Sequence, residues 1–249
     1  MLTSCRLVKR GFAVQKALRL GRPGVSLKMG IVGMANIGKS STFNLIAKLN
    51  VPAENYPFCT IEPNTALIKI ADPRFEKLCE MFEPAKTVAP VLKVVDIAGL
   101  VKGASEGHGL GNEFLSNITS VDGIYQVVRA FSNDNILHTE GNMDPIRDVE
   151  IIRDELIKKD LQVVNKRIDE TAGKAARAQN NRELKLTYDT MLKARDILKK
   201  HRELRCEEWT SKDEVDVLNR LVFLTAKPIV YLINMSKEDF LSEKKLPNE

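Results

Sequence analysis

The chain has 249 residues, of which 43% are hydrophobic and 29% are charged, and its net charge is +5 at pH 7. This length allows one large domain or a domain with a sizeable insertion. No run of about 18 apolar residues is present, which argues against a membrane span. Four cysteines and three histidines are scattered without the spacing of a structural zinc site, so reduced thiols are expected.

The positive charge is concentrated at the N-terminus. Residues 1–28 carry seven Lys and Arg and no acid, whereas the rest of the chain has 31 basic and 33 acidic residues. We expect a disordered basic tail over residues 1–25. It is interpreted as a leader without a role or an arm that touches RNA, and organellar targeting is the minor alternative because Ser and Thr are few.

Residues 33–40, with the sequence GMANIGKS, match the phosphate-binding loop pattern G-x-x-x-x-G-K-[ST]. An apolar strand ending at Val32 precedes the loop, and a helix is expected after it. In such loops backbone N–H groups hold the α- and β-phosphates, the lysine reaches the β- and γ-phosphates, and the serine hydroxyl binds Mg²⁺. The residues expected around a nucleotide are Asn36, Ile37, Gly38, Lys39, Ser40 and Ser41.

Residues 51–64 are too rich in proline for a helix or a central strand, which predicts a long loop. In a nucleotide-hydrolysing P-loop protein this position holds a switch segment, whose threonine binds Mg²⁺ and the γ-phosphate. Thr60 is the candidate catalytic and metal-binding residue. An ordinary loop threonine is an equally good interpretation of its position.

A strand over 65–70, a helix over 74–82 and a strand over 91–95 are predicted next. The last strand leads into Asp96 and Gly99, which supply a carboxylate near Mg²⁺ and a backbone N–H for the γ-phosphate. The two motifs together predict a nucleotide switch similar to that of G proteins. The expected Mg²⁺ ligands are Ser40, Thr60 and, through water, Asp96.

Residues 103–111 contain four glycines, as expected of a loop that reorders on hydrolysis. In Ras-type GTPases a glutamine at the position of Leu100 orients the attacking water, and leucine cannot do this. Slow turnover is therefore expected unless another group positions the water. His108 is the catalytic candidate, although a loop histidine without a catalytic role is the more common case. A helix over 113–120 and a strand over 123–129 follow.

Residues 144–210 differ in character, because two helical stripes of apolar residues run through a highly charged sequence. They predict an antiparallel helical hairpin, a coiled-coil arm, with its turn over 172–182. Eleven basic and five acidic residues lie between Lys166 and Arg202. This charge favours RNA or another anionic partner, and a solvated helix surface is the default alternative.

A capping box beginning at Ser211 predicts a further helix, and residues 229–233 predict a final buried strand. The strand leads into Asn-Met-Ser-Lys, where G proteins carry the guanine-recognition motif N-K-x-D. Lys237 replaces the acid that would accept hydrogen bonds from guanine, so guanine specificity is not expected. The expected base is adenine, contacted by Asn234 and the main chain around Met235.

Several segments resemble the Obg-like ATPases, the YchF group within the Obg family of P-loop proteins. They are LKMGIVGMANIGKSSTFN, NYPFCTIEPN, VVDIAGLVKGASEGHGLGNEFL, VVRAF, MDPIRDVEII and KPIVYLINMS. The resemblance implies an α/β G domain, with a mostly parallel sheet flanked by helices and an inserted coiled coil. It also implies Mg²⁺-dependent hydrolysis of ATP in preference to GTP, and association with ribosomes. Asn36 matches a P-loop asparagine that in related switches helps hold a monovalent cation such as K⁺.

Two departures from the family accompany this resemblance. The family usually has N-x-x-E as its base motif, whereas this chain has Lys237 followed by Glu238. The family also continues into the remainder of the G domain and a TGS domain, so a C-terminally truncated chain without these parts is expected. The predicted domains are a nucleotide-binding G domain over 26–143 and 211–249 and an arm over 144–210.

These observations lead to one expectation and two alternatives. The chain is expected to be a Mg²⁺-dependent ATPase switch that acts with the translation machinery, as a cytoplasmic monomer without a membrane partner. The first alternative is a GTPase of the Obg class. The second is a nucleotide-gated RNA or ribosome adaptor whose hydrolysis is incidental.

Overall fold

The computed structural model describes residues 20–21, 27–48, 64–97, 99, 110–133, 136–177 and 181–242. The predictions for residues 1–19 and 22–25 of the N-terminal tail, for the 51–63 loop and for the 100–109 loop therefore lie outside the described residues. The chain divides into two compact units. We call residues 23–155 and 229–249 the sheet unit, and residues 1–22 and 156–228 the helical unit.

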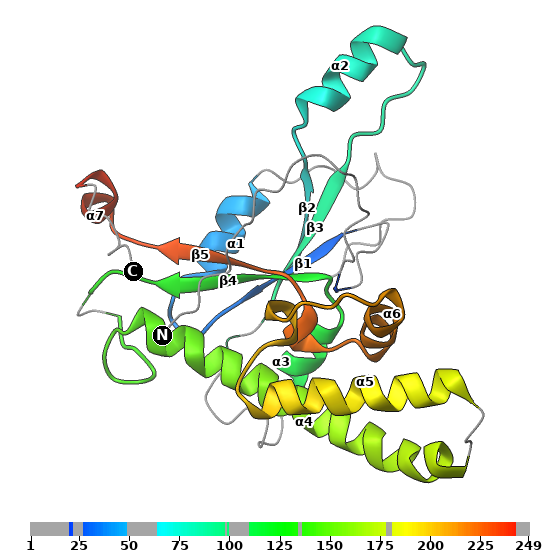
Figure 1. Cartoon of the computed structure of the whole chain (residues 1–249). Helices are drawn as coiled ribbons and strands as arrows, with labels where there is room; N and C mark the ends of the chain where they lie inside the picture. The colour runs from blue at the N-terminus through cyan, green and yellow to red at the C-terminus, as the bar shows by residue number, and fades with distance from the viewer. Residues whose placement is uncertain are drawn as a thin grey trace. The chain divides into compact units, whose positions relative to one another are not determined.

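The sheet unit contains one sheet with the strand order β2-β3-β1-β4-β5 (Figure 1). Strand β2 runs antiparallel to β3, and the other neighbouring strands are parallel. The α/β class and the mostly parallel sheet are thus confirmed. The strands are β1 (Lys28–Val32), β2 (Thr65–Lys69), β3 (Val91–Asp96), β4 (Gly123–Arg129) and β5 (Ile229–Asn234).

Of the three inner strands, β1 and β4 consist largely of apolar residues because both of their faces are covered. Ile31, Val32 and Ile124 have no exposed surface. In the register of the sheet, Ile31 lies opposite Asp96 on one side and Tyr125 on the other. The carboxyl ends of β1, β3 and β4 therefore meet at one edge, where ligands bind in open α/β sheets.

Strand β5 was expected to be buried, and this expectation is wrong. Val230, Tyr231 and Ile233 are between 45% and 48% exposed. Among the described residues, β5 pairs only with β4, so it is an edge strand. An apolar run predicts a strand but cannot distinguish a central strand from an edge strand, because that difference is set by distant neighbours.

Four helices of the sheet unit are α1 (Lys39–Ala47), α2 (Pro73–Phe82), α3 (Leu110–Thr119) and α7 (Lys237–Leu241). Helix α1 packs on β1, β2 and β3. Helix α2 begins after Asp72, whose carboxylate accepts a hydrogen bond from the Arg74 amide. Among the helices that the structure describes, none combines the length and the apolar character needed to cross a membrane.

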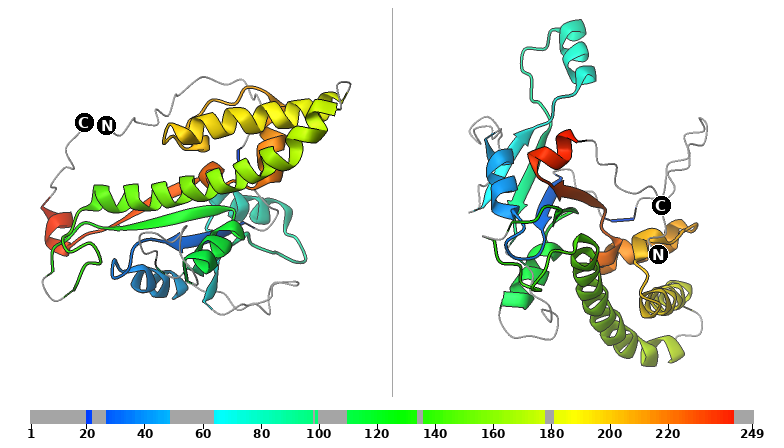
Figure 2. Two further views of the ribbon diagram at one scale, coloured as in Figure 1. Left: turned by 90° about the horizontal axis from the view of Figure 1, so that it is seen from below. Right: turned by 90° about the vertical axis from the view of Figure 1, so that its left-hand side faces the viewer.

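The helical unit is built from α5 (Arg182–Lys199), α6 (Lys212–Leu221), two short 3-10 helices and most of α4 (Pro145–Arg177), which begins in the sheet unit. Figures 1 and 2 show α5 beside the C-terminal half of α4. Both helices contribute to one buried cluster with α6, so the predicted boundary at residue 210 lies within this unit. Members of the cluster include Val164, Ile168, Met191, Leu198, Leu218 and Phe223.

The predicted turn over residues 172–182 is too long. Helix α4 continues to Arg177, and α5 begins directly after Asn181, whose side chain accepts a hydrogen bond from the Leu184 amide. Alanine is the strongest helix former, and three alanines between residues 172 and 176 outweigh the cost of Gly173. The sequence analysis was wrong to place Gly173 in the turn, because α4 continues through it.

A carboxylate lies in the core of the helical unit. Asp160 of α4 is 2% exposed and accepts hydrogen bonds from the Leu224 amide at 2.9 Å and the Thr225 amide at 2.8 Å. It also accepts a bond from the Thr225 hydroxyl at 2.7 Å. Burial raises the pKa of Asp160 to about 6, although these bonds and the nearby Lys227 favour its charged form.

Candidate functional site

The predicted phosphate-binding loop connects β1 to α1 and depends on two glycines. A Cβ atom at Gly33 would lie 2.1 Å from the Ile37 side chain and 2.8 Å from the Val127 carbonyl oxygen. Gly38 precedes α1 with a φ of 96°, in the left-handed region that favours glycine. Because no side chain caps α1 at this position, its first backbone N–H groups are available to an anion.

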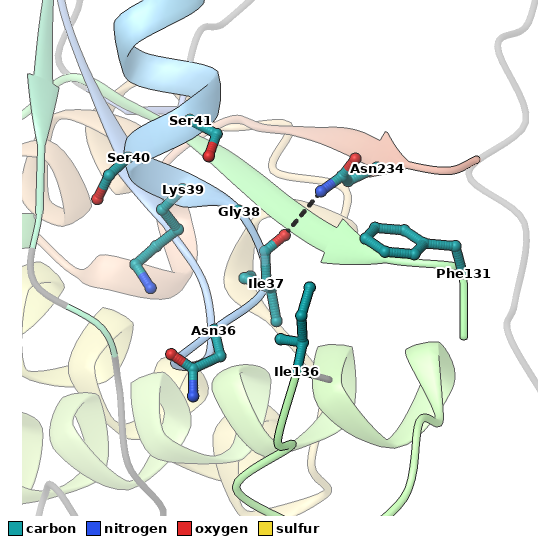
Figure 3. Close-up of a pocket in the computed structure, with 9 residues that line it drawn as sticks. All are labelled: Asn36, Ile37, Gly38, Lys39, Ser40, Ser41, Phe131, Ile136 and Asn234. Atoms are coloured by element: carbon teal, nitrogen blue, oxygen red, sulfur yellow. Dashed lines mark hydrogen bonds between the residues drawn. The ribbon is translucent and has the colours of Figure 1, made fainter. Parts of the chain in front are cut away.

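A cavity of about 380 Å³ opens at this loop (Figure 3). Its lining comes from three segments of the sheet unit that are far apart in the sequence: the loop with the start of α1, the segment after β4, and the end of β5. The lining residues are Asn36, Ile37, Gly38, Lys39, Ser40, Ser41, Phe131, Ile136 and Asn234. The structure thus places seven of the eight residues that we expected to bind the nucleotide around one cavity.

The remaining predicted nucleotide contact, Met235, is half-buried and does not belong to this lining. The catalytic candidates Thr60 and His108 lie outside the described residues. Their roles therefore stay predictions.

Lys39 supplies the positive charge of the cavity. It is 8% exposed, and its ammonium donates a hydrogen bond to the Met34 carbonyl oxygen at 2.6 Å. Burial lowers the pKa of Lys39, and the charge of Asp96 acts in the opposite direction. A Cβ atom at Gly99 would lie 2.9 Å from the Lys39 ammonium, so Gly99 lies directly beside this charge.

The carboxylate of Asp96 lies at the end of β3, next to the start of α1. Its Oδ2 atom accepts a hydrogen bond from the Ser40 hydroxyl at 3.2 Å. Its Oδ1 atom is buried and has no hydrogen-bond partner among the described residues. Burial raises the pKa of Asp96, whereas Ser40 and Lys39 lower it. A hydroxyl and a carboxylate with a spare oxygen are suitable donors for Mg²⁺, directly or through water.

Asn234 was expected to contact the base, and the structure gives its amide another partner. The Asn234 Nδ2 atom donates a hydrogen bond to the Ile37 carbonyl oxygen at 3.0 Å (Figure 3). The same nitrogen would lie 2.5 Å from a Cβ atom at Gly38. Asn234, at the end of β5, therefore holds the phosphate-binding loop through this hydrogen bond.

The sequence analysis missed the cavity wall formed by Phe131 and Ile136. Arg129, which is 2% exposed, donates hydrogen bonds to the carbonyl oxygens of Phe131 at 3.0 Å and Ile136 at 3.2 Å. Its guanidinium carbon also lies 4.9 Å from the centre of the Phe131 ring. The sequence signal for this wall was Arg129 at the end of a buried strand, with the aromatic Phe131 two positions later.

Replacing Gly38 with alanine is expected to weaken nucleotide binding by about tenfold or more, because holding a non-glycine residue at this φ costs roughly 1–3 kcal/mol. The new methyl group would also displace the Asn234 amide. Titration with a fluorescent ATP analogue measures the effect. Gly173→Ala is the matched control, since nothing lies within 4 Å of a Cβ atom there. Equal affinities of the two variants would contradict the assignment.

Comparison with known proteins gives the same family from sequence and from structure. Residues 28–167 match the family described as 50S ribosome-binding GTPase. The chain is 45% identical over 236 residues to Obg-like ATPase 1 of Caenorhabditis elegans, covering 95% of this chain and 59% of that protein. It is 50% identical over 227 residues to Obg-like ATPase 1 of Xenopus laevis, covering 90% and 57%.

The solved structure of the Schizosaccharomyces pombe YchF GTPase is similar, with a TM-score of 0.73 and 46% sequence identity. That match covers 91% of this chain and 61% of the other. The chain therefore spans about three fifths of the length of these relatives. It belongs to the 50S ribosome-binding GTPase family and, within it, to the Obg-like ATPase group of P-loop proteins.

Proposed function

We propose that this chain hydrolyses ATP to ADP and phosphate, with Mg²⁺ as cofactor, and switches conformation as it does so. The observation that carries the proposal is that the buried Lys39 ammonium lines a cavity of about 380 Å³ at the loop, beside Ser40, whose hydroxyl bonds to an Asp96 carboxylate with a spare oxygen. Family membership supports nucleotide hydrolysis. The names of the relatives include both an ATPase and a GTPase.

The residues of this chain have separate tasks in the proposed reaction. The N–H groups at the start of α1 hold the phosphates, and Lys39 moves from the Met34 carbonyl onto the β- and γ-phosphate oxygens. Gly99 offers its backbone N–H beside that ammonium. Ser40 and Asp96 would hold Mg²⁺, with Thr60 as the third predicted ligand. When bound, Mg²⁺ neutralises charge on the phosphate oxygens.

A monovalent cation is a second proposed cofactor. The Asn36 side chain uses its nitrogen to donate a hydrogen bond to the Leu137 carbonyl at 3.1 Å. Figure 3 shows its oxygen on the side of Lys39, where it is suited to bind K⁺. This arrangement supports the role implied by the family resemblance.

The preference for adenine rests on the residues that follow β5, where G proteins carry the acid that recognises guanine. Phe131 and Ile136 offer apolar surface to a purine ring, and Asn234 is engaged with the loop. Guanine needs an acid to accept hydrogen bonds from its ring nitrogens, and Lys237 occupies that position as the first residue of α7. The competing GTPase function is favoured by the name of the YchF relative, which is called a GTPase.

Titration of the chain with labelled ATP and GTP tests this preference directly. ATP is expected to bind more tightly, and GTP binding that is about tenfold tighter would reject the proposal, since a missing acceptor costs guanine at least that much. The double substitution Met235→Lys and Lys237→Asp is expected to raise GTP affinity relative to ATP by about tenfold. Glu238→Gln, one position further along α7, is the control and should leave the ratio unchanged.

We also propose that the arm contacts RNA or the ribosome. Several of its basic side chains are exposed and form no ion pair in the described structure, namely Lys166, Arg182, Lys185, Lys199 and Lys200. Other cations of the arm are already paired, as Arg167 is with Glu170 at 3.4 Å. The unpaired charges are the ones that can release counterions from a phosphate backbone.

Changing Lys185, Lys199 and Lys200 together to glutamine is expected to weaken RNA binding and flatten its salt dependence. Each lost phosphate contact lowers the slope of log K against log salt by about 0.7 for a single strand. Filter binding at several salt concentrations measures this. The control removes three exposed lysines from the sheet unit, Lys48, Lys69 and Lys86. Equal losses in both variants would mean that net charge, rather than the arm, determines binding.

A further inference from the structure

The segment that follows β4 contains a second set of buried polar groups, which the proposed hydrolysis does not use. His138 and Asp148 each have side chains that are 4% exposed, and the His138 Nε2 and Asp148 Oδ2 atoms lie 2.8 Å apart. The backbone N–H of Glu140 donates to His138 Nδ1 at 3.1 Å. Since Nδ1 accepts this bond, Nε2 carries the proton and donates it to Asp148. The hydrogen bonds therefore assign one orientation and one tautomer to the ring.

Asp148 anchors this pair on a regular element. It belongs to the first turn of α4, and its amide donates to the Asp144 carbonyl oxygen at 3.1 Å. Arg147 donates to its Oδ1 atom at 3.4 Å. The histidine is thus held between the backbone of its own segment and the start of a helix.

One residue before His138, the chain touches the phosphate-binding loop. The Leu137 carbonyl oxygen accepts the hydrogen bond from the Asn36 side chain at 3.1 Å. Asn36 has a φ of 59°, which is uncommon outside glycine. The torsion that turns an asparagine amide is broad, so a fixed acceptor is needed to determine which way its oxygen points. The Leu137 carbonyl supplies that acceptor.

The neighbouring residues are fixed as well. Arg129 holds the carbonyl oxygens of Ile136 and Asn133, both at 3.2 Å. The residues on both sides of Leu137 in the sequence are therefore held in place. Ile136 is held by Arg129, and His138 is held by Asp148 and the Glu140 amide. A buried hydrogen bond between two polar side chains fixes the orientation of both, so the His138–Asp148 contact favours a role in geometry.

We propose that His138 and Asp148 are positioning residues for the phosphate-binding loop, which act through the Leu137 carbonyl on the Asn36 amide. The inference rests on the proposed nucleotide function, because the loop has to bind phosphates for its geometry to matter. It adds that the segment between β4 and α4 determines the direction of the Asn36 oxygen in the cavity.

A double-mutant cycle between His138→Ala and Asn36→Ala tests the proposal. Each single variant is expected to weaken binding of an ATP analogue by roughly tenfold, the value of one lost hydrogen bond near 1.4 kcal/mol. If His138 acts through Asn36, the double variant is no weaker than either single one. A double variant whose loss equals the product of the two single losses would overturn the proposal.

Three further variants separate positioning from general damage. Asp148→Asn keeps an oxygen to accept the His138 Nε2–H bond and should retain the affinity of the unmodified chain. Ile146→Ala, at an exposed position of the same turn, should also retain it. Ile118→Val removes a methylene from a fully buried side chain of the sheet unit and controls for reduced stability. Its unfolding midpoint should fall while its affinity does not.

A spectroscopic readout works without any nucleotide. The side-chain amide signal of Asn36, identified by its loss in Asn36→Ala, should shift in His138→Ala and stay in place in Asp148→Asn. An unmoved signal in His138→Ala would reject the positioning role. If the signal moves but the unmodified chain binds no ATP, the proposed function fails while the structural coupling stands.

Discussion

Replacing Lys39 with methionine is expected to lower ATP turnover by about 10²-fold or more and to weaken ATP binding, because electrostatic contacts to transferring phosphates are worth several kcal/mol. Methionine keeps the apolar part of the side chain and removes the ammonium that lies 2.6 Å from the Met34 carbonyl oxygen. Phosphate release at limiting and saturating ATP measures both quantities. The loss should appear in kcat as well as in KM, since the proposed mechanism places the ammonium on the γ-phosphate.

The control for this substitution lies on the same helix. Lys48 is exposed at the C-terminal end of α1, so Lys48→Met should keep the turnover of the unmodified chain. Retention of a third or more of the activity in Lys39→Met would place hydrolysis at another site. A loss of binding without any activity in the unmodified chain would instead identify a nucleotide-gated adaptor.

The second large effect concerns stability. At about pH 4, Asp160→Asn is expected to reduce the free energy of unfolding by about 2–4 kcal/mol, because an amide nitrogen must face a backbone or hydroxyl donor and leave it unsatisfied in the core. One of the bonds from the Leu224 amide or from Thr225 is lost in either orientation. Urea unfolding measures the change. Asp169→Asn, exposed on the same helix, should alter stability by less than about 0.5 kcal/mol.

The raised pKa of Asp160 also predicts how this difference depends on pH. The folded state holds the proton up to a pKa of about 6, whereas an unfolded aspartate releases it near 3.8. The stabilisation is therefore fully present below pH 4 and is lost as the pH rises through 6. One unit of pKa corresponds to about 1.4 kcal/mol, so the advantage over Asp160→Asn should shrink by on the order of 2–3 kcal/mol across this window. A constant advantage between pH 4 and pH 7 would contradict it.

The parts of the fold that are determined by local pattern were predictable from the sequence. The bounds of β4 agree with the prediction, and those of β3 and α2 differ by a single residue. The phosphate-binding loop could be located because its glycines and lysine occupy fixed spacings that backbone sterics require. Ser211 caps α6 as the capping box predicts, accepting a hydrogen bond from the Glu214 amide.

The parts that were missed depend on distant residues. The Asn234 amide contacts a carbonyl 197 positions away, and Asn36 contacts one 101 positions away. No local sequence pattern predicts either bond, since an asparagine in a loop or at a strand end could equally contact a ligand. Arg129 and His138 were overlooked for a different reason. Their partners are nearby in the sequence, but they are backbone carbonyls and a buried acid, which no residue spacing marks.

The hydrogen bond between the Asn234 amide and the Ile37 carbonyl has a consequence for synthesis on the ribosome. Strand β1 and its loop are made early, but the amide that completes the loop is incorporated only 197 residues later. A nascent chain that ends before Asn234 lacks this bond and the strand that carries it, and contacts over such long separations form slowly. The loop is thus completed late, when β5 joins β4.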